Sequence, residues 1–552
     1  MDPIWLQSYP AAVDAAPSVA GGSLAEMIRA RCERYAEREA FWSLGCSLSF
    51  GECYAHARAV AAWLRQQGVR PGERVAIMLP NVLTFPVATL GAVLGGYVVV
   101  TVNPSYTARE LAYQLTDSGA RTLIAWEPAV AVIDKAITDG ALALDRLVTV
   151  APKSLLGTGP APGRATGGTH PARHVFEELL AAGTADTATP VARAAGDPAF
   201  LLYTGGTTGV SKGAVLTHRN LLTQLAQQQA WFGPFLNDAN GPHRAVIPLP
   251  LYHAGALLVG LFHGVDAGSA TVLIADPRNL DDYVATLIAQ RFTSIGGINT
   301  LYSALLHHPR IGEVDFSQCL FAFAGAAATQ PAVAARWRAL TGLEISEIYG
   351  LTEACGIVSA QAFDGRPFDG TVGLPLPLAE LSIRDADGRE LGVGEPGEVC
   401  VRGPQVMAGY WNRPDETAKV MTTDGYLRTG DVGSLDARGY LRISDRQKDM
   451  ILVSGFNVYP NEIEAVLLAH PRVLEAAVVS VPDPRSGEAP AAFVVRRDVS
   501  LTEAELRAFC AEQLTAYKRP KRFEFRDTLP KTPVGKILRR VLRDEAERPA
   551  AG

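Results

Sequence analysis

The chain lacks the features expected of an exported, zinc-stapled or nucleic-acid-binding protein. Its 552 residues hold only seven cysteines, with no CxxC pair and no Cys/His cluster at metal-ligand spacing, so we expect a reducing compartment and no structural zinc. A formal net charge of −6 gives no overall basic character that would favour nucleic acid. The start, MDPIWLQSYP, carries acid and proline where a secretory signal has a basic and then an apolar segment, so we expect no export.

An unbroken apolar segment long enough to cross a membrane is also missing. The longest charge-free stretch runs between Arg74 and Arg109, and its prolines and glycines divide it into short pieces. We interpret these pieces as two buried strands, RVAIML and YVVVTV, around a helix. Residues 152–173, rich in Gly, Pro and Ala, predict a surface loop.

Length and hydrophobic pattern predict a large α/β enzyme with more than one domain. A chain of 552 residues with 48% hydrophobic residues exceeds what one core usually serves. Apolar β-rich runs alternate with helix-length segments, which indicates largely parallel sheets. These runs are RVAIML, YVVVTV, TLIAW, RLVTV, AFLLY, AVIPL, ATVLIA and LEISEIY. From about Ala379, shorter alternating strands predict a small antiparallel barrel.

The pattern changes to a small α+β unit near Asp445 to Lys448. Helices NEIEAVLLAHP and TEAELRAFCAEQL then alternate with strands EAAVVSV, AAFVVRR and RFEFR. Ser500 and Glu503 have the spacing of a capping box for the second helix. We therefore predict domains at 1–446 and 447–552.

Residues 203–214, YTGGTTGVSKGA, form a glycine-rich polar segment directly after an apolar run. Glycines let backbone N–H groups approach phosphate oxygens, and the hydroxyls and Lys212 add further donors. The segment does not match a Walker loop, in which Gly-Lys precedes Ser or Thr and opens a helix, because here Ser211 precedes Lys212 and Gly213 follows it. Taken alone, the segment fits a phosphate loop and a solvated turn about equally well.

Three further motifs distinguish these alternatives. Residues 347–353 read EIYGLTE, 426–431 read YLRTGD, and 530–536 read PKTPVGK. With the glycine-rich segment, in this order, they resemble the adenylate-forming superfamily over nearly the whole chain. The linking segments are most similar to bacterial long-chain fatty-acid–CoA ligases, through VNPSYTARELAYQL, LPLYH, GPQVMAGYWNRPDET and DRQKDMILVSGFNVYPNEIE.

The resemblance implies a fold and a moving part. It implies a large AMP-binding domain of two doubly wound sheets plus a small β-barrel, followed by a smaller, mobile α+β lid domain. In the family, a residue of the DRQK segment is the hinge on which the lid turns, and Lys448 occupies that position.

The resemblance also implies a nucleotide site. Asp431 would accept the ribose hydroxyls, Tyr349 would stack on adenine, and Arg446 would contact the sugar. The remaining implied ATP-binding residues are Tyr203, Thr204, Gly205, Gly206, Thr207, Thr208, Gly209, Val210, Ser211, Lys212, Gly213, Ala214, Gly350 and Thr352.

Activation of a carboxylate by ATP brings two anions together, so the site needs positive charge where charge develops. By resemblance one cation is Mg²⁺, held with Thr208 and Glu353, and the other is the catalytic lysine, Lys536. Without the PKTPVGK context, Lys536 would be one basic residue among several in KILRR.

For the acyl substrate the resemblance implicates His253 and the segment Gly325, Ala326 and Ala327. Long-chain ligases tend to have glycines where this chain has Ala326 and Ala327, and methyl groups projecting into the acyl tunnel would favour medium or slender chains. Gly455 and Phe456 are implied to line the CoA tunnel after the lid has turned.

The predicted activity is that of an AMP-forming fatty-acid–CoA ligase with a medium- or long-chain acid, ATP and CoA as substrates and Mg²⁺ as cofactor. Open alternatives are a free-standing enzyme that loads a carrier protein, a CoA ligase for a dicarboxylic, branched or aromatic acid, and a relative that holds nucleotide without turnover. We expect a cytoplasmic enzyme without nucleic-acid partners, and leave open weak contact with the inner membrane face and a homodimer.

Overall fold

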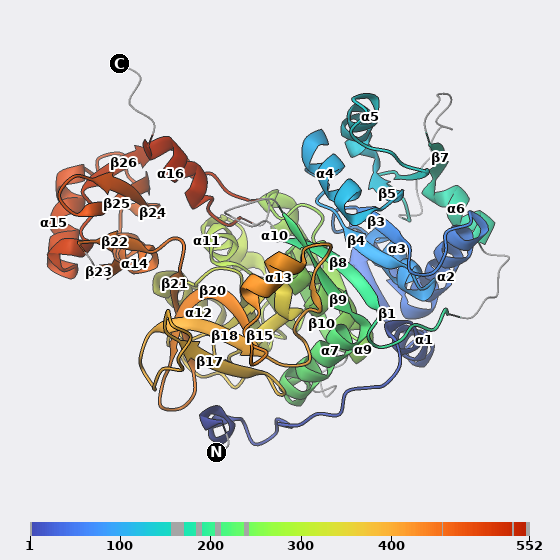
Figure 1. Ribbon diagram of the computed structural model, residues 1–552, viewed down its shortest axis with the longest axis horizontal. Helices are drawn as coiled ribbons and strands as arrows, with labels where there is room; N and C mark the ends of the chain where they lie inside the picture. Colours follow the sequence, from blue (N-terminus) through green and yellow to red (C-terminus); the bar gives the residue numbers. More distant parts are fainter. Residues whose placement is uncertain are drawn as a thin grey trace.

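The computed structural model folds into a large N-terminal domain and a smaller C-terminal domain, which lie side by side in Figure 1. It describes residues 3–155, 171–183, 190–204, 211–236, 242–454, 456–532 and 535–547. The predicted fold class, a mixed α/β protein with a second, smaller α+β domain, is confirmed.

The first sheet of the large domain has eight strands in the order β19-β9-β8-β4-β3-β5-β6-β7. The strands from β8 through β4, β3, β5 and β6 to β7 are parallel to one another. At the other edge, β9 pairs antiparallel with β8, and β19 pairs antiparallel with β9. The apolar runs form its centre because strands covered on both faces need continuous hydrophobic sequence. The bounds are β3 Arg74–Met78, β4 Val98–Thr101, β5 Thr122–Trp126, β6 Arg146–Val150, β7 Ala172–Val175, β8 Pro198–Thr204, β9 Lys212–Thr217 and β19 Gly409–Tyr410.

The second sheet has nine strands in the order β16-β15-β14-β13-β12-β10-β11-β1-β2. Its middle strands are parallel, and antiparallel pairs close both edges. The bounds are β1 Glu39–Ser43, β2 Cys46–Ser49, β10 Arg244–Ile247, β11 Ala270–Leu273, β12 Ser294–Gly297, β13 Phe321–Ala324, β14 Ile345–Leu351, β15 Gly356–Ala360 and β16 Leu374–Pro375.

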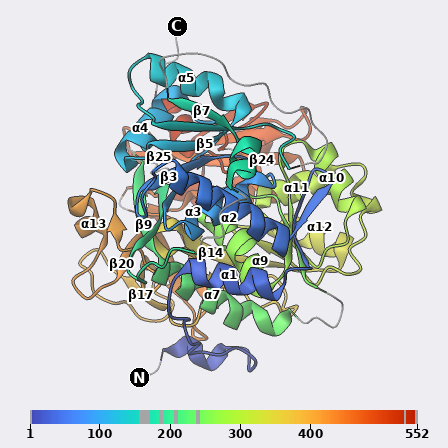
Figure 2. The same ribbon diagram turned by 90° about the vertical axis from the view of Figure 1, so that its right-hand side faces the viewer.

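Helices connect and cover these sheets, and Figure 2 shows α1, α2, α3, α7 and α9 grouped on one side of the large domain. The α-helices are α1 Leu24–Arg34, α2 Phe50–Gln66, α3 Thr84–Leu94, α4 Ala108–Ser118, α5 Val130–Thr138, α6 Phe176–Gly183, α7 His218–Phe232, α8 Ala254–Ala256, α9 His263–Ala267, α10 Leu280–Ala289, α11 Asn299–His307, α12 Pro331–Thr341 and α13 Pro414–Val420. Short 3-10 helices are η1 Ile4–Ser8, η2 Glu127–Ala129, η3 Gly233–Phe235, η6 Ile311–Glu313, η7 Thr352–Ala354 and η8 Ala516–Lys518, and η5 Leu257–Phe262 is a π-helix.

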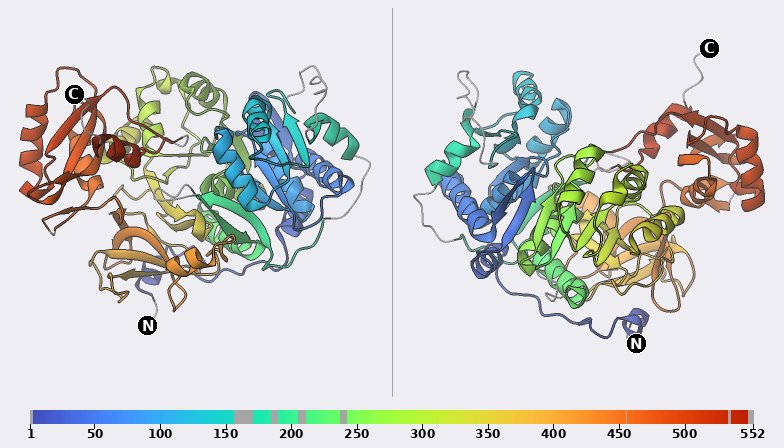
Figure 3. Two further views of the ribbon diagram at one scale, coloured as in Figure 1. Left: turned by 45° about the horizontal axis from the view of Figure 1, so that its top comes forward. Right: turned by 180° about the vertical axis from the view of Figure 1, so that it is seen from behind.

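A four-stranded antiparallel sheet, in the order β17-β18-β20-β21, follows where a small barrel was predicted. Its strands are β17 Glu380–Arg384, β18 Gly397–Arg402, β20 Leu427–Leu435 and β21 Leu441–Arg446. Figure 3 shows this sheet, in orange, beneath the large sheets and next to the N-terminal segment.

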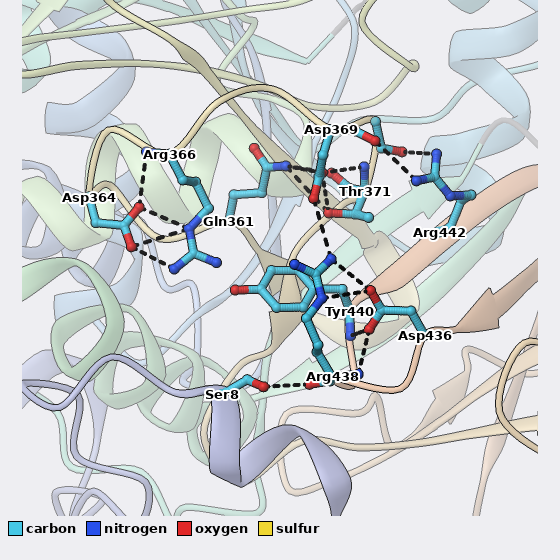
Figure 4. A network of polar contacts seen from close by, with 11 residues as sticks. Ser8, Gln361, Asp364, Arg366, Asp369, Thr371, Asp436, Arg438, Tyr440 and Arg442 are labelled. Atoms are coloured by element: carbon cyan, nitrogen blue, oxygen red, sulfur yellow. Dashed lines mark hydrogen bonds and ion pairs between the residues drawn. The ribbon is translucent and has the colours of Figure 1, made fainter.

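A polar network ties this sheet to the end of β15 (Figure 4). Asp369 accepts hydrogen bonds from Gln361 Nε2 at 3.1 Å and Thr371 Oγ1 at 2.7 Å, and lies 3.7 Å from Arg438 Nη2. Ser8 Oγ donates to the backbone oxygen of Arg438 at 2.7 Å. The network therefore fixes the β20–β21 hairpin relative to the nine-stranded sheet, which positions Asp431 against β14.

The C-terminal domain is a five-stranded sheet covered on both faces. Its elements are β22 Ile451–Val453, β23 Phe456–Val458, α14 Pro460–Ala469, β24 Val473–Asp483, β25 Gly487–Arg496, α15 Glu503–Gln513, β26 Arg522–Arg526 and α16 Arg539–Glu547. The predicted capping box at Ser500 and Glu503 is wrong by two residues, because Thr502 caps α15 and pairs with Glu505. Both pairs have the same spacing, and only the helix start distinguishes them.

Within the described part of the chain, the length and hydropathy that a membrane-crossing helix requires are not combined in any one helix.

Candidate active site

The glycine-rich segment follows an apolar strand, β8, as the sequence predicted, and it leads into a second strand, β9, which pairs with β8. Strand β8 ends at Thr204, β9 starts at Lys212, and these two residues face each other in the ladder. Ser211 Oγ donates to the backbone oxygen of Thr204 at 2.7 Å and so closes the neck of the hairpin. Lys212 starts a strand instead of a helix, which confirms that the segment is not a Walker loop. Gly205, Gly206, Thr207, Thr208, Gly209 and Val210 lie outside the described residues.

The structure brings Tyr349, Asp431, Arg446, Lys448 and Lys536 together where the two domains meet. Tyr349 Oη donates to Asp431 Oδ2 at 2.7 Å, and Arg446 Nε lies 3.2 Å from Asp431 Oδ1. The carboxylate is buried, with a side-chain exposure of 7%, and it faces three cations. We call these five residues the junction cluster.

The cations of the junction cluster repel one another. Burial, and then the charge of Arg446, lowers the pKa of Lys536 to about 8. Lys448 has its pKa lowered to about 8 for the same two reasons. Three cations beside one carboxylate leave an excess of positive charge, which an anionic ligand such as a polyphosphate would neutralise.

Lys536 is positioned by a loop that docks on the large domain. Thr300 Oγ1, on α11, donates to the backbone oxygen of Gly535 at 3.2 Å. Gly535 has φ +80°, and a Cβ there would lie 2.8 Å from Thr300 Oγ1 and 2.9 Å from Ile298. Both the left-handed backbone and the close approach require glycine, so the GK pair of the motif places the lysine in the cluster.

The pH dependence of the first half-reaction should report the lowered pKa of Lys536. If the protonated lysine is required, kcat/KM for ATP in pyrophosphate release should fall as pH rises through about 8. Lys448→Ala removes a neighbouring positive charge, so it should move this alkaline limb to higher pH. A limb that does not move in Lys448→Ala would assign the titration to another group.

A second group of contacts surrounds Tyr410 on β19. Tyr410 Oη donates to Glu353 Oε1 at 2.8 Å, and Lys212 Nζ lies 4.8 Å from the centre of the Tyr410 ring. Lys212 also pairs with Glu416 at 2.7 Å. The predicted residues Lys212 and Glu353 are therefore held next to one tyrosine, which the sequence did not single out.

Glu353 suits the predicted Mg²⁺ role. Within the described ranges it forms no ion pair with a basic side chain, and its one side-chain partner is the Tyr410 hydroxyl. Mg²⁺ commonly takes one or two carboxylates and fills its other positions with phosphate oxygens and water. The described residues contain no group of three or more His, Cys, Asp or Glu side chains that could hold a metal by themselves. Thr208, the other predicted ligand, lies outside the described residues.

Several predicted nucleotide residues shape the backbone. Gly350 must be glycine, because a Cβ there would lie 1.6 Å from the backbone oxygen of Gly356. Thr352 starts η7, which carries Glu353. Tyr203 Oη donates to Asp117 Oδ2 at 2.7 Å, and its ring packs over Gly213. Ala214 is fully buried on β9.

The predicted acyl-contact residues lie around the ends of β13 and α8. His253 precedes α8; solvent reaches its side chain, although the surrounding protein lowers its pKa to about 4. Gly325 follows β13, and Ala326 and Ala327 are exposed. The loop is anchored by Glu347, which accepts from Thr329 N at 2.7 Å and whose pKa burial raises to about 7. The narrowing of the acyl tunnel by Ala326 and Ala327 stays a prediction.

Ala326 has a φ of 65°, which is the left-handed region that non-glycine residues seldom adopt. This conformation costs an L-residue ~1–2 kcal/mol. A glycine at the same position would lose ~0.5–1 kcal/mol more conformational entropy on folding than alanine does, which is the smaller cost. Ala326→Gly should therefore raise the free energy of unfolding by about 0.5–1 kcal/mol. The matched variant Ala327→Gly, at a residue without positive φ, should lower it. Urea unfolding measures the change in the free energy of unfolding for both variants. Changes of the same sign in the two variants would contradict the proposed backbone strain at Ala326.

Phe456 is the predicted CoA residue that the structure describes, and it is not part of the junction cluster. Phe456, on β23, is 57% exposed, and its ring stacks on Tyr517 with centres 4.8 Å apart. Figure 1 shows β23 on the side of the C-terminal domain that is turned away from β8 and β9. Gly455 lies outside the described residues.

Arg539 on α16 binds acidic residues at the domain junction. Its guanidinium lies 3.2 Å from Asp445, 3.7 Å from Asp449 and 2.6 Å from Glu464. Asp445 also accepts from the backbone N–H of Asn461 at 2.9 Å, and burial raises its pKa. Nothing in the sequence pattern distinguished Arg539 from the other basic residues near the C-terminus.

Fold and site together define a nucleotide-binding enzyme whose site is completed by a second domain. Two family models match: AMP-binding enzyme over residues 28–411, and AMP-binding enzyme C-terminal domain over residues 462–536. The chain belongs to the AMP-binding enzyme family.

One similar sequence and two similar structures extend the comparison. The chain is 44% identical to a long-chain-fatty-acid–CoA ligase of Escherichia coli O157:H7, over 99% of both chains. Its fold is similar to that of ATP-bound MatB from Rhodopseudomonas palustris, with a TM-score of 0.81, 31% identity, and 94% of this chain and 98% of that one covered. It is also similar to the anthranilate CoA ligase AuaEII in complex with anthranoyl-AMP, with a TM-score of 0.84, 26% identity and 98% of each chain covered.

Proposed function

We propose that this enzyme is an AMP-forming fatty-acid–CoA ligase. A fatty acid and ATP would give an acyl-adenylate and pyrophosphate, and CoA would then displace AMP to give acyl-CoA. The observation that carries the proposal is the junction cluster, in which Lys536 of the C-terminal domain meets Asp431 and Arg446 of the large domain.

In the first half-reaction, a carboxylate oxygen attacks the α-phosphorus and the bond to pyrophosphate breaks. Lys536 would donate to the oxygens on which charge develops, and this stabilisation is strong because the lysine is held in place beforehand. Asp431 would accept the ribose hydroxyls in exchange for its hydrogen bond from Tyr349. The ring of Tyr349 would then stack on the adenine base. Mg²⁺ bound by Glu353 and Thr208 would neutralise phosphate charge.

In the second half-reaction, the CoA sulfur attacks the acyl carbonyl carbon and AMP leaves. Lys536 at the junction would obstruct the thiol, so we propose that the C-terminal domain, residues 447–552, turns relative to residues 1–446 about Lys448. The turn would bring Gly455 and Phe456 to the site, and the exposure of Phe456 in the present orientation supports this role.

The names of relatives support the choice of substrates. The relatives from Escherichia coli and Haemophilus influenzae are long-chain-fatty-acid–CoA ligases, the latter at 40% identity. For this chain we propose a medium- or long-chain acid, with His253, Gly325, Ala326 and Ala327 near its carboxyl end. We also propose a cytoplasmic location, with weak contact at the inner membrane face and a homodimer as hypotheses for cell fractionation and sedimentation.

The test is pyrophosphate release with a panel of saturated acids from butyrate to palmitate, together with a dicarboxylic, a branched and an aromatic acid. CoA and a phosphopantetheinylated carrier protein are offered as alternative acceptors, with AMP and thioester both quantified. We expect acid-dependent AMP formation and acyl-CoA. Transfer to the carrier protein alone would favour the carrier-loading alternative, dicarboxylic or aromatic acids turned over in preference would change the substrate class, and ATP binding without pyrophosphate release would exclude catalysis.

A further inference from the structure

Helix α11 contacts the C-terminal domain at two points. Thr300, near its start, donates to the backbone oxygen of Gly535, and the Nε2 atom of His307, its last residue, lies 2.9 Å from Arg497 Nη1. Figure 1 shows α11 on the side of the large domain that faces the C-terminal domain. Seven residues of helix rise about 10 Å in about two turns, so both contacts lie on one face and are well separated. Two separated contacts fix the orientation of a domain, whereas one contact leaves it free to pivot.

The contacts of His307 determine which of its ring nitrogens carries the proton. Nδ1 lies 2.6 Å from the backbone oxygen of Ser303, which can only accept, so Nδ1 is the donor. Nε2 lies 2.9 Å from Arg497 Nη1 and 3.0 Å from Arg336 Nη1, and a guanidinium can only donate. His307 is therefore a neutral imidazole whose one free lone pair receives two cationic donors, one from each domain.

Arg336, on α12, and Arg497 meet without a counter-ion. No carboxylate of the described residues forms an ion pair with either guanidinium. Burial, and then the charge of Arg336, lowers the pKa of Arg497, as expected when two cations approach each other. The backbone of Arg497 is held in place, because its N–H donates to the Arg472 oxygen at 2.8 Å. We call His307, Arg336 and Arg497 the interdomain cluster.

The interdomain cluster contains two opposed interactions across the domain boundary. Arg497 donates a charge-assisted hydrogen bond to His307, which favours the present orientation. Arg497 also faces the like charge of Arg336, which disfavours this orientation. Because all three side chains are exposed, both interactions are weak, and they offset each other in part. The C-terminal domain is thus held at this end of α11 without being fixed there.

We propose that His307 is a positioning residue for adenylation, and that Arg336 keeps the bond of His307 to Arg497 weak enough for the C-terminal domain to leave before thioester formation. The inference rests on the proposed ligase function, in which Lys536 is needed at the junction cluster for the first half-reaction and away from it for the second. The interdomain cluster lies at the opposite end of α11 from the loop that carries Lys536, so it acts only through the orientation of the domain.

The experiment removes the two interactions one at a time. His307→Ala removes the acceptor but leaves Arg336 facing Arg497, so the rate of pyrophosphate release should fall by ~3- to 10-fold. Arg336→Ala removes the like charge and a competing donor, so thioester formation from supplied acyl-adenylate should fall by a similar factor, whereas pyrophosphate release should not. His307→Gln, whose amide oxygen can replace Nε2 as the acceptor, should restore pyrophosphate release.

Double variants test whether both effects pass through Arg497. In an Arg497→Ala background, His307→Ala and Arg336→Ala should each change neither half-reaction by more than ~2-fold, since the partner of both interactions is gone. Arg338→Ala is the matched control, because this neighbouring arginine pairs with Glu344 inside the large domain at 3.0 Å. It should leave both half-reactions unchanged.

The orientation of the C-terminal domain is measured without turnover. Spin labels at Val393→Cys in the large domain and Val499→Cys in the C-terminal domain, two exposed positions, report the distance between the domains. Singly labelled proteins correct for the native cysteines. His307→Ala should lower the population that has the present distance, and Arg336→Ala should raise it.

The outcomes separate this inference from the ligase function. Shifts of the same sign in His307→Ala and Arg336→Ala, unchanged populations in both, or shifts that persist in the Arg497→Ala background would overturn the inference and leave the ligase function intact. Opposite shifts in the label distances, with no turnover of any acid by the wild-type enzyme, would overturn the ligase function and support the assigned control of domain orientation.

Discussion

Replacing Lys536 by alanine should slow acyl-adenylate formation by ~10²-fold or more, as is typical when a prepositioned donor to developing charge is removed. Thioester formation from supplied acyl-adenylate and CoA should remain close to wild type, because the lysine would have left the site by then. The two half-reactions are followed separately, by single-turnover pyrophosphate release and by AMP release from the acyl-adenylate.

Lys531→Ala is the matched control, since Lys531 belongs to the same motif but pairs with Glu475 within the C-terminal domain. It should leave both half-reactions nearly unchanged. An equal loss in both half-reactions for Lys536→Ala would remove the lysine from its assigned role and indicate a general structural effect.

Lys448→Pro should give the opposite result. Proline fixes φ at the proposed hinge and restricts the residue before it, so the C-terminal domain would be held in one orientation. The present orientation already places Lys536 in the junction cluster, so adenylation should continue. Thioester formation should fall by ~10²-fold, comparable to misplacing a reacting group.

Lys448→Ala separates the loss of charge from the loss of hinge freedom. It removes a cation next to Asp431 but leaves the backbone free, so its effect on thioester formation should be small. If Lys448→Pro slowed both half-reactions equally, or if Lys448→Ala had the same effect as proline, rotation at this residue would be contradicted.

The sequence was sufficient to predict the fold class and the residues of the junction cluster. The apolar runs form the predicted strands because buried parallel strands need continuous hydrophobic sequence, a local property. Tyr349, Asp431 and Lys536 belong to motifs whose order is shared across a family, so their proximity could be expected without knowing the path of the chain.

Partners that are distant in sequence could not be predicted. Tyr410 contacts Glu353 and Lys212 because β19 pairs with β9, and no spacing in the sequence indicates this pairing. The capping error at Ser500 has another cause: two pairs with identical spacing compete, and tertiary packing determines where the helix starts.

The ion pairs of Arg539 have a consequence for the balance between two orientations of the C-terminal domain. Asp449 and Glu464 follow Lys448 in the chain and would turn together with Arg539, whereas Asp445 precedes Lys448 and would be left behind. Reorientation would then separate Arg539 from Asp445, and it would also break the hydrogen bonds of Asn461 to Asp445 and Ser444 and that of Thr300 to Gly535. The departure of pyrophosphate would leave the junction cations unneutralised again, which would favour the orientation in which Lys536 has left the site and the thioester forms.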